Sequence, residues 1–227
     1  AGAESTGAAA TSGMTFDATG IDGIDMNVGG ISSLASSSSV NADSDASSVS
    51  GPATATGGLD STGMSEAHLY SSSDSDVSGI ATIAGGINAE STKLAAKADA
   101  DFDADGITDL NMGAGGLFDL AGQAQVNGDV SASSVSGTAD AASGANASAA
   151  QGDPISKYVS NESTISGLDS VEIDVASDAS VLGTAVGSFT TTAESTDSAA
   201  TAEANQDVFG IQAIDISVGG VGSIAAI

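Results

Sequence analysis

The densest group of potential metal ligands is the run Asp101-Phe102-Asp103-Ala104-Asp105-Gly106, which Asp109 follows. Carboxylates at alternate positions of a loop can turn toward one hard cation, and glycine permits the tight turn that such a loop needs. We therefore take the candidate ligands of a metal site to be Asp101, Asp103, Asp105 and Asp109, with calcium as the candidate cofactor. A strand that carries an acidic outer row explains the same residues without a metal.

This pattern resembles the calcium loops of EF-hand and dockerin-type modules over residues 101–109. The resemblance implies a bidentate glutamate at the twelfth loop position, where this chain has Met112 instead. The corresponding stretches in other copies of the repeat described below, 16–19 and 207–209, do not keep the ligands.

The sequence singles out no catalytic group. His68 is the only histidine, and no particular nucleophile or orienting partner accompanies it among the many serines and aspartates. Carboxylate pairs could hydrolyse glycosides, but sugar sites need aromatic platforms, and the chain has no Trp and two Tyr. The glycine-rich run 113–116 lacks the lysine of a phosphate loop. We predict that the chain is not an enzyme.

The charge of the chain restricts its partners. The chain has three basic residues, Lys93, Lys97 and Lys157, and 30 acidic residues, so its formal net charge is -27. Nucleic acids and anionic membrane surfaces repel such a chain, and no run of 18 apolar residues predicts membrane insertion. The partners that remain are cations and, at high ionic strength, further copies of the chain itself.

An internal repeat organises the sequence. Residues 20–51 align without a gap with residues 106–137 at an offset of 86, and both end in Ala-Ser-Ser-Val-Ser-Gly. The front half of this motif, motif A, returns at 210–227. A weaker motif, motif B, reads GLDSVEIDV at 167–175, and we match it with GIATIAGGI at 79–87. The predicted order is therefore A-B-A-B-A.

Both motifs predict strands. Ile24, Met26 and Val28 alternate with Asp25 and Asn27, and the other copies alternate in the same way. This period of two places apolar residues on one face and hydrated polar residues on the other. Residues 90–98 could form a short connecting helix, with Lys93 and Lys97 four residues apart. We expect an all-β fold of antiparallel sandwich or barrel-like units with little helix.

The predicted organisation follows the repeat. Residues 1–15 form an N-terminal segment, 16–102 a first β-rich unit, 103–206 a second unit, and 207–227 a partial third repeat. Residues 138–152 are expected to form the loosest loop and the boundary between units. A start at Ala1 fits a mature protein whose export signal has been removed, which predicts an extracellular or cell-surface location, and removal of the initiator methionine is the alternative explanation.

The predicted function is structural. We expect a subunit of an extracellular filament, pilus-like fibre or sheath, joined by β-strand contacts, with strand donation by residues 210–227 as one route and closure of the chain's own sheet as the other. The alternatives are a calcium-dependent adhesin, an ice-binding module and a phage fibre or decoration protein. The candidate assembly residues are the apolar side chains of the last segment: Ile214, Ile216, Val218, Val221, Ile224 and Ile227.

Overall fold

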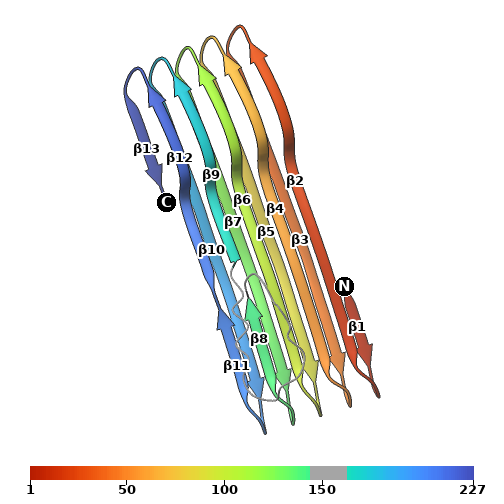
Figure 1. Cartoon of the computed structure of the whole chain (residues 1–227). Helices are drawn as coiled ribbons and strands as arrows, with labels where there is room; N and C mark the ends of the chain where they lie inside the picture. The colour runs from red at the N-terminus through yellow and green to blue at the C-terminus, as the bar shows by residue number, and fades with distance from the viewer. Residues whose placement is uncertain (144–162) are drawn as a thin grey trace.

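The described chain is a two-sheet solenoid whose strands are all parallel. The computed structural model describes residues 1–143 and 163–227, which form one six-stranded and one seven-stranded sheet (Figure 1). Every described strand pair is parallel. The all-β class is thus confirmed, and the antiparallel sandwich or barrel is wrong. A period of two occurs in both kinds of strand, so alternation could not distinguish them.

The chain passes from one sheet to the other at each turn. Each coil of the solenoid therefore contains one row of sheet A and one row of sheet B, where a row is one long strand or two short strands end to end. Sheet A contains, in spatial order, β1 (Gly2–Ser5), β3 (Ser32–Ser48), β5 (Ser75–Ser91), β7 (Phe118–Ser134), β10 (Ala179–Ser195) and β13 (Gly222–Ala226). Sheet B contains β2 (Ala10–Val28), β4 (Ala53–Ser71), β6 (Ala96–Ala114), then β8 (Ala139–Ser143) with β9 (Ser163–Val175), and last β11 (Ala200–Ala204) with β12 (Gln206–Val218).

The structural repeat is 43 residues, half of the offset seen in the sequence. Ala10 pairs with Ala53, and Ala53 with Ala96; the offset becomes 61 across the segment that includes residues 144–162. Motif B at 167–175 lies in register with motif A, since Leu168 pairs with Ile107. The match with 79–87 is therefore wrong, because those residues belong to sheet A.

Two alternating kinds of turn explain why the offset of 86 was the more visible one. Along the side of the solenoid where each sheet B strand leads into sheet A, turns that contain Gly-Gly and an apolar residue alternate with turns that end in aspartate. The Oδ1 of Asp74 accepts the Leu117 N–H of the next coil at 2.9 Å, and the Oδ1 of Asp178 accepts the Val221 N–H at 2.8 Å. Each aspartate turn thus satisfies a backbone donor of the glycine turn beside it.

A column of serines stabilises the opposite turns. Each of these serines ends a strand of sheet A, accepts the N–H of the residue three positions later at 2.9–3.2 Å, and donates to a carbonyl in the preceding coil's turn at 2.7–2.9 Å. Both hydrogen bonds stabilise the tight turn. The column consists of Ser48, Ser91, Ser134 and Ser195, which explains the shared Ser-Val-Ser-Gly of two coils.

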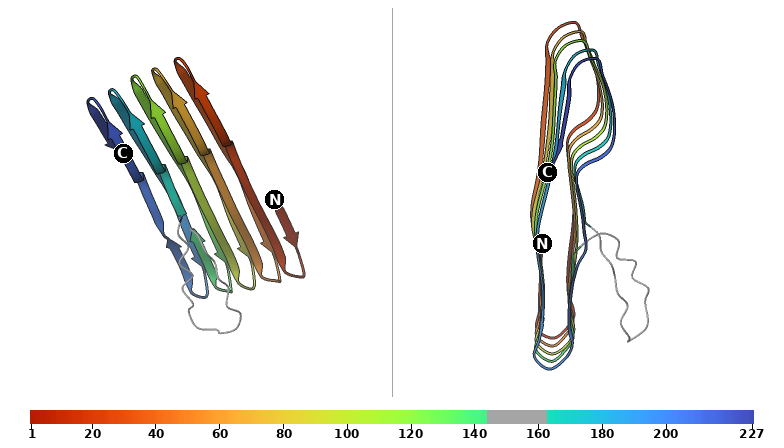
Figure 2. Two further views of the ribbon diagram at one scale, coloured as in Figure 1. Left: turned by 45° about the horizontal axis from the view of Figure 1, so that its top comes forward. Right: turned by 90° about the vertical axis from the view of Figure 1, so that its left-hand side faces the viewer.

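Glycines divide the interior into two hydrophobic clusters. Sheet B bends toward sheet A at one level of every coil (Figure 2), and we call this level the waist. A Cβ on Gly79, Gly122 or Gly183 of sheet A would overlap the carbonyl oxygen of a sheet B glycine, respectively Gly106, Gly167 and Gly210. Phe102, Ile83 and Val126 lie in the cluster on one side of the waist, and Met112, Phe118 and Leu168 in the other.

In sheet B, the residue three positions after each of these glycines has a left-handed backbone conformation, and these residues form a column across the coils. Its members include Asp109 at φ 50° and Ser170 at φ 54°, and Gly23, Glu66 and Ala213 complete it. This conformation is costly for residues other than glycine, and it interrupts the alternation. Ile107 and Leu110 both face inward although they are three residues apart.

The connecting helix predicted over 90–98 is wrong. Residues up to Ser91 belong to β5, residues 92–95 form the turn, and β6 starts at Ala96. Pairing of β5 and β6 with their parallel neighbours outweighs the weak local helix signal. Most of the expected loop, 138–152, lies outside the described residues, and its first residues belong to β8.

Candidate functional site

The aspartates of the predicted calcium site lie along the outer face of β6. Asp101, Asp103 and Asp105 are alternate residues of an extended strand, so their side chains leave it about 7 Å apart and side by side. Asp109 follows on the far side of the waist. Among the described residues, no three His, Cys, Asp or Glu side chains come together to hold a metal. The structure therefore does not bring the four predicted ligands together.

These carboxylates instead form part of an acidic surface. Asp17, Asp60 and Asp103 pair in register across three coils. Burial, followed by repulsion from Asp17 and Asp103, raises the pKa of Asp60. Burial also raises the pKa of Asp103, although the Thr164 N–H, 2.9 Å from its Oδ1, opposes that rise. Parallel stacking thus places like charges about 4.8 Å apart, a cost that cations and salt reduce.

The largest of these effects occurs beside the waist. Burial, together with repulsion from Asp169, Asp60 and Asp103, raises the pKa of Asp105 to about 7. Burial, followed by repulsion from Asp103 and Asp60, raises the pKa of Asp101 to about 6. A raised carboxyl pKa means that the folded state holds its proton at a pH where the unfolded chain has lost it. Stability therefore falls as the pH rises from about 4 to about 7.

We expect Asp105→Asn to stabilise the protein at pH 8. The substitution removes a buried charge, and the gain can reach about 4 kcal/mol, since each pKa unit corresponds to about 1.4 kcal/mol. At pH 3.5 both forms are neutral, so the gain should vanish. Urea denaturation at the two pH values measures the difference, with Asp119→Asn, an exposed residue of β7, as the control. An equal gain at both pH values would contradict the charge argument.

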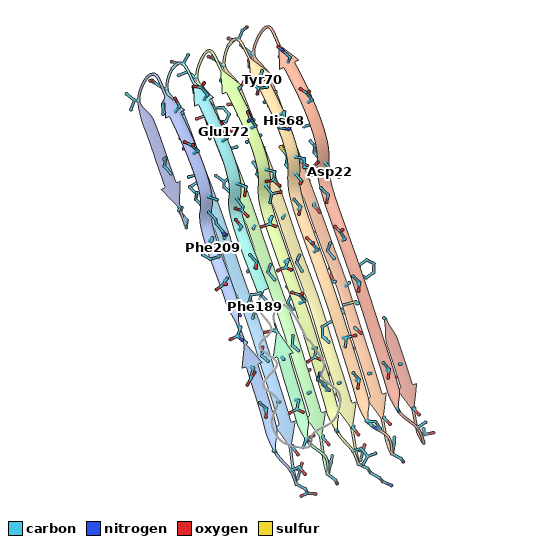
Figure 3. The ribbon with its side chains drawn as sticks, viewed as in Figure 1. Asp22, His68, Tyr70, Glu172, Phe189 and Phe209 are labelled. Carbon is cyan, nitrogen blue, oxygen red and sulfur yellow. The ribbon has the colours of Figure 1, made fainter. Side chains whose placement is uncertain are left out.

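His68 lies in a polar column on the outer face of sheet B. It is exposed on β4 and pairs in register with Asp25 and Asn111. Tyr70 and Glu172 lie on the same face of sheet B (labelled with His68 in Figure 3). The Tyr70 hydroxyl donates to Asn111 Oδ1 at 3.3 Å, and Asn111 Nδ2 donates to Glu172 Oε2 at 3.0 Å. These contacts join neighbouring coils at the surface.

The predicted assembly residues belong to the last coil. Ile214, Ile216 and Val218 face inward from β12, which pairs with β9 of the same chain, and Ile224 belongs to β13, which pairs with β10. The C-terminal segment thus closes the chain's own sheets on one edge. No described strand covers its other edge, and Val221, Ile224 and Ile227 are 73%, 57% and 72% exposed.

β2 is the other edge strand of sheet B among the described residues, and the sequence did not single it out. Phe16 of β2 occupies the same inward column as Leu59 and Phe102. Leu59 and Phe102 are 2% and 0% exposed, whereas Phe16 is 50% exposed, because no described coil stacks on it. Ile24 and Met26 are likewise only partly buried. The 43-residue spacing was the signal that could have placed Phe16 in the column of Leu59 and Phe102.

The backbone of β2 also points outward at this edge. The Ala10 N–H donates to the Pro52 carbonyl of the next coil at 3.0 Å. Because successive residues of a strand direct their amides to opposite sides, outward-facing residues such as Thr11 and Thr15 direct theirs away from β4. Asp45 of β3 follows the same rule, as its N–H donates at 2.8 Å to the carbonyl oxygen of Ala1, the residue before β1. The edge of β2 therefore presents a row of donors and acceptors.

Comparison with known proteins yields no relative. No protein-family model, no curated protein and no solved structure matches the chain. No helix of the described residues is long and apolar enough to cross a membrane. The function is therefore inferred from the geometry of the solenoid.

Proposed function

We propose that the chain is a structural subunit of an extracellular or cell-surface assembly, such as a filament, fibre or sheath, whose subunits associate through β-strand contacts. The observation that carries this proposal is the regular parallel solenoid of the described residues, whose coils stack in register along one axis at a spacing of 43 residues. Such a solenoid presents backbone donors and acceptors along its edge strands, which pair readily with further β-strands. A virion fibre would use the same geometry.

The alternative binding functions have less support. A calcium-dependent adhesin needs converging oxygen ligands, and the four candidate aspartates lie side by side along β6. An ice-binding face needs ranks of similar small side chains, whereas one outward column of sheet A has the sequence Ser37, Ile80, Gln123 and Thr184. Neither function gains a specific observation.

The charge supports a saline exterior as the setting. With a net charge of -27, separate copies repel one another in dilute buffer. At the ionic strength of sea water the screening length falls to several ångströms, so that strand pairing and apolar contact can dominate. Cations are then partners of the assembly without a dedicated site.

Assembly of the purified chain should therefore depend on salt. We expect elongated particles in electron micrographs at about 0.5 M NaCl or with millimolar divalent cations, and dispersed chains at about 10 mM NaCl. Light scattering follows the transition in a titration. Circular dichroism at each step controls for folding. The absence of ordered particles at every salt concentration would overturn the proposed function, and equal assembly at 10 mM and 0.5 M NaCl would overturn its electrostatic part.

A further inference from the structure

We propose that copies of this chain associate side by side, so that a ridge of turns along one side of a solenoid packs against the opposite ridge of the next copy, in a register that brings like turns together. The arrangement rests on the proposed structural function, for which it specifies a contact and a partner, a second copy of the same chain. Because the ridges lie along the sides of the solenoid, the contact does not depend on the first or the last described coil.

Two ridges of turns run along the solenoid. The turns from sheet B to sheet A form the first ridge, and those from sheet A to sheet B form the second, at the opposite end of the coils (Figures 1 and 2). A strand such as β4, with 19 residues, holds the ridges about 60 Å apart, so their turns do not contact each other within one chain. The first ridge comprises residues 29–31, 72–74, 115–117, 176–178 and 219–221, and the second residues 6–9, 49–52, 92–95, 135–138 and 196–199.

Exposed apolar side chains lie on both ridges in the same coils. In the coil of β2 and β3, Ile31 lies on the first ridge and Val49 on the second. In the coil of β6 and β7, Leu117 and Val135 have the same positions, and these four side chains are between 45% and 76% exposed. Duplication of a two-coil unit explains why each ridge alternates, but not why these apolar residues of the two ridges share a coil. Packing of one ridge on the other uses this match.

The coil between these two carries opposite charges on its two ridges. Asp74 lies on the first ridge and Lys93 on the second, and both side chains are exposed. Within the described part of the chain, the ion pair is between Lys97 and Asp99, and Lys93 forms none. A neighbouring copy can supply the missing carboxylate from its first ridge. Leu94, in the same turn as Lys93, gains no apolar partner from this contact.

Only registers that bring like turns together satisfy both kinds of contact. With the coils level, Lys93 lies opposite Asp74, and with an offset of two coils it lies opposite Asp178. A shift of one coil places Lys93 opposite an apolar turn instead. The level register also sets Asp178 against Asp197, so the two-coil offset, about 10 Å along the axis, is the better match.

The contact itself is small. In the two-coil offset, Leu117 packs on Val49 and Val221 on Val135, and four turns face one another. The width of two packed sheets, about 10 Å, and four turns at about 4.8 Å give an area of about 200 Å² per copy, well below the about 800 Å² of a stable pair of proteins. Isolated pairs should therefore dissociate, and the contact should persist in a layer whose copies are held on both ridges.

The spacing of neighbouring solenoids gives the first test. Contact through the ridges predicts parallel solenoid axes about 70 Å apart, whereas contact through the sheet faces predicts about 20 Å. Electron cryo-microscopy of assemblies grown at about 0.5 M NaCl measures this spacing. Assemblies packed through their faces, or with uncovered ridges, would overturn the ridge contact and leave the proposed structural function standing. The absence of any ordered particle would overturn both.

The same substitution at two valines gives the second test. Val135 lies on the second ridge and is 46% exposed, and Val186 lies on the outer face of β10 and is 48% exposed. Val135→Ser should raise the protein concentration at which layers form by about threefold or more, because it removes an apolar contact. Val186→Ser should leave that concentration unchanged. Equal concentrations for the two variants would contradict the ridge contact.

Lys93 gives the third test. Lys93→Gln removes the cation of the second ridge, whereas Gln125→Glu makes the same change in net charge on the exposed outer face of β7. Lys93→Gln should require at least about twofold more NaCl for half-assembly than Gln125→Glu does. Equal midpoints would mean that net charge alone matters, and the ridge contact would be wrong. Circular dichroism separates folding from assembly in all four variants, and if a valine variant does not fold, the Lys93 comparison decides.

Discussion

Replacing Gly122 by alanine should destabilise the folded chain strongly. The added methyl would overlap the carbonyl oxygen of Gly167 and the side chain of Leu168. The first of these is backbone of the facing sheet, which cannot move without disturbing the coils on both sides. Overpacking of this kind costs about 3 kcal/mol or more, against a typical total stability of 5–15 kcal/mol. Chemical denaturation monitored by circular dichroism measures the loss.

Gly58→Ala is the matched control for this substitution. Gly58 is also a strand glycine, but it faces outward on β4, and a methyl there would first meet Thr15 at 3.8 Å. Alanine loses less conformational entropy on folding than glycine does, so the control should be neutral or stabilising by up to about 1 kcal/mol. Equal losses for the two substitutions would show that the waist is not a close approach of the sheets.

The strand faces could be predicted from the sequence because they depend on neighbours two residues apart. Ile24, Met26 and Val28 do face the interior, and Asp25 and Asn27 do not. The direction of pairing depends instead on residues 43 apart, and two alternating kinds of turn obscured that spacing. Asp74 and Asp178 belong to one kind, and Gly115 and Gly219 to the other. An offset of 86 superimposes turns of the same kind.

Long-range pairing also explains the expectations that were wrong. Lys93 and Lys97 have helical spacing, but the chain around them lies between parallel neighbours, where Glu90 pairs with Ser47 and Ser133. Asp101, Asp103 and Asp105 match a calcium loop in their order, but Gly58, Asp60 and Thr62 of β4 pair with them and keep the strand extended. Pairing with neighbouring strands thus overrides the local preference for a helix or a calcium loop, and the spacing of residues within one segment does not reveal that pairing.

The candidate assembly surface was predicted at one end only. Residues 210–227 stood out as a partial copy of the repeat, and their apolar side chains do lie at an uncovered edge. Residues 20–28 have the same alternation but belonged, in the sequence, to a complete copy. Their position at the opposite edge follows only from the stacking order of sheet B.

The interior beside the waist offers a second large effect, at Phe102. This ring is fully buried, and it lies 5.8 Å from the ring of Phe189, centroid to centroid. Gly85 and Gly128 of sheet A face it, where an added Cβ would lie 3.1 Å and 2.7 Å from the ring atoms of Phe102. Phe102→Ala should therefore leave a cavity between the sheets and cost about 3–5 kcal/mol in free energy of unfolding.

Gly128→Ala should be costly for the opposite reason, because its methyl would overlap the ring of Phe102 and approach that of Phe189 at 2.8 Å. Alone it should cost about 1–3 kcal/mol. In the Phe102→Ala background the methyl meets only one ring and fills part of the cavity. The double variant should then be more stable than the sum of the two losses by at least 1 kcal/mol. Urea denaturation of all four chains measures this coupling, and strict additivity would mean that the glycines of sheet A do not accommodate Phe102.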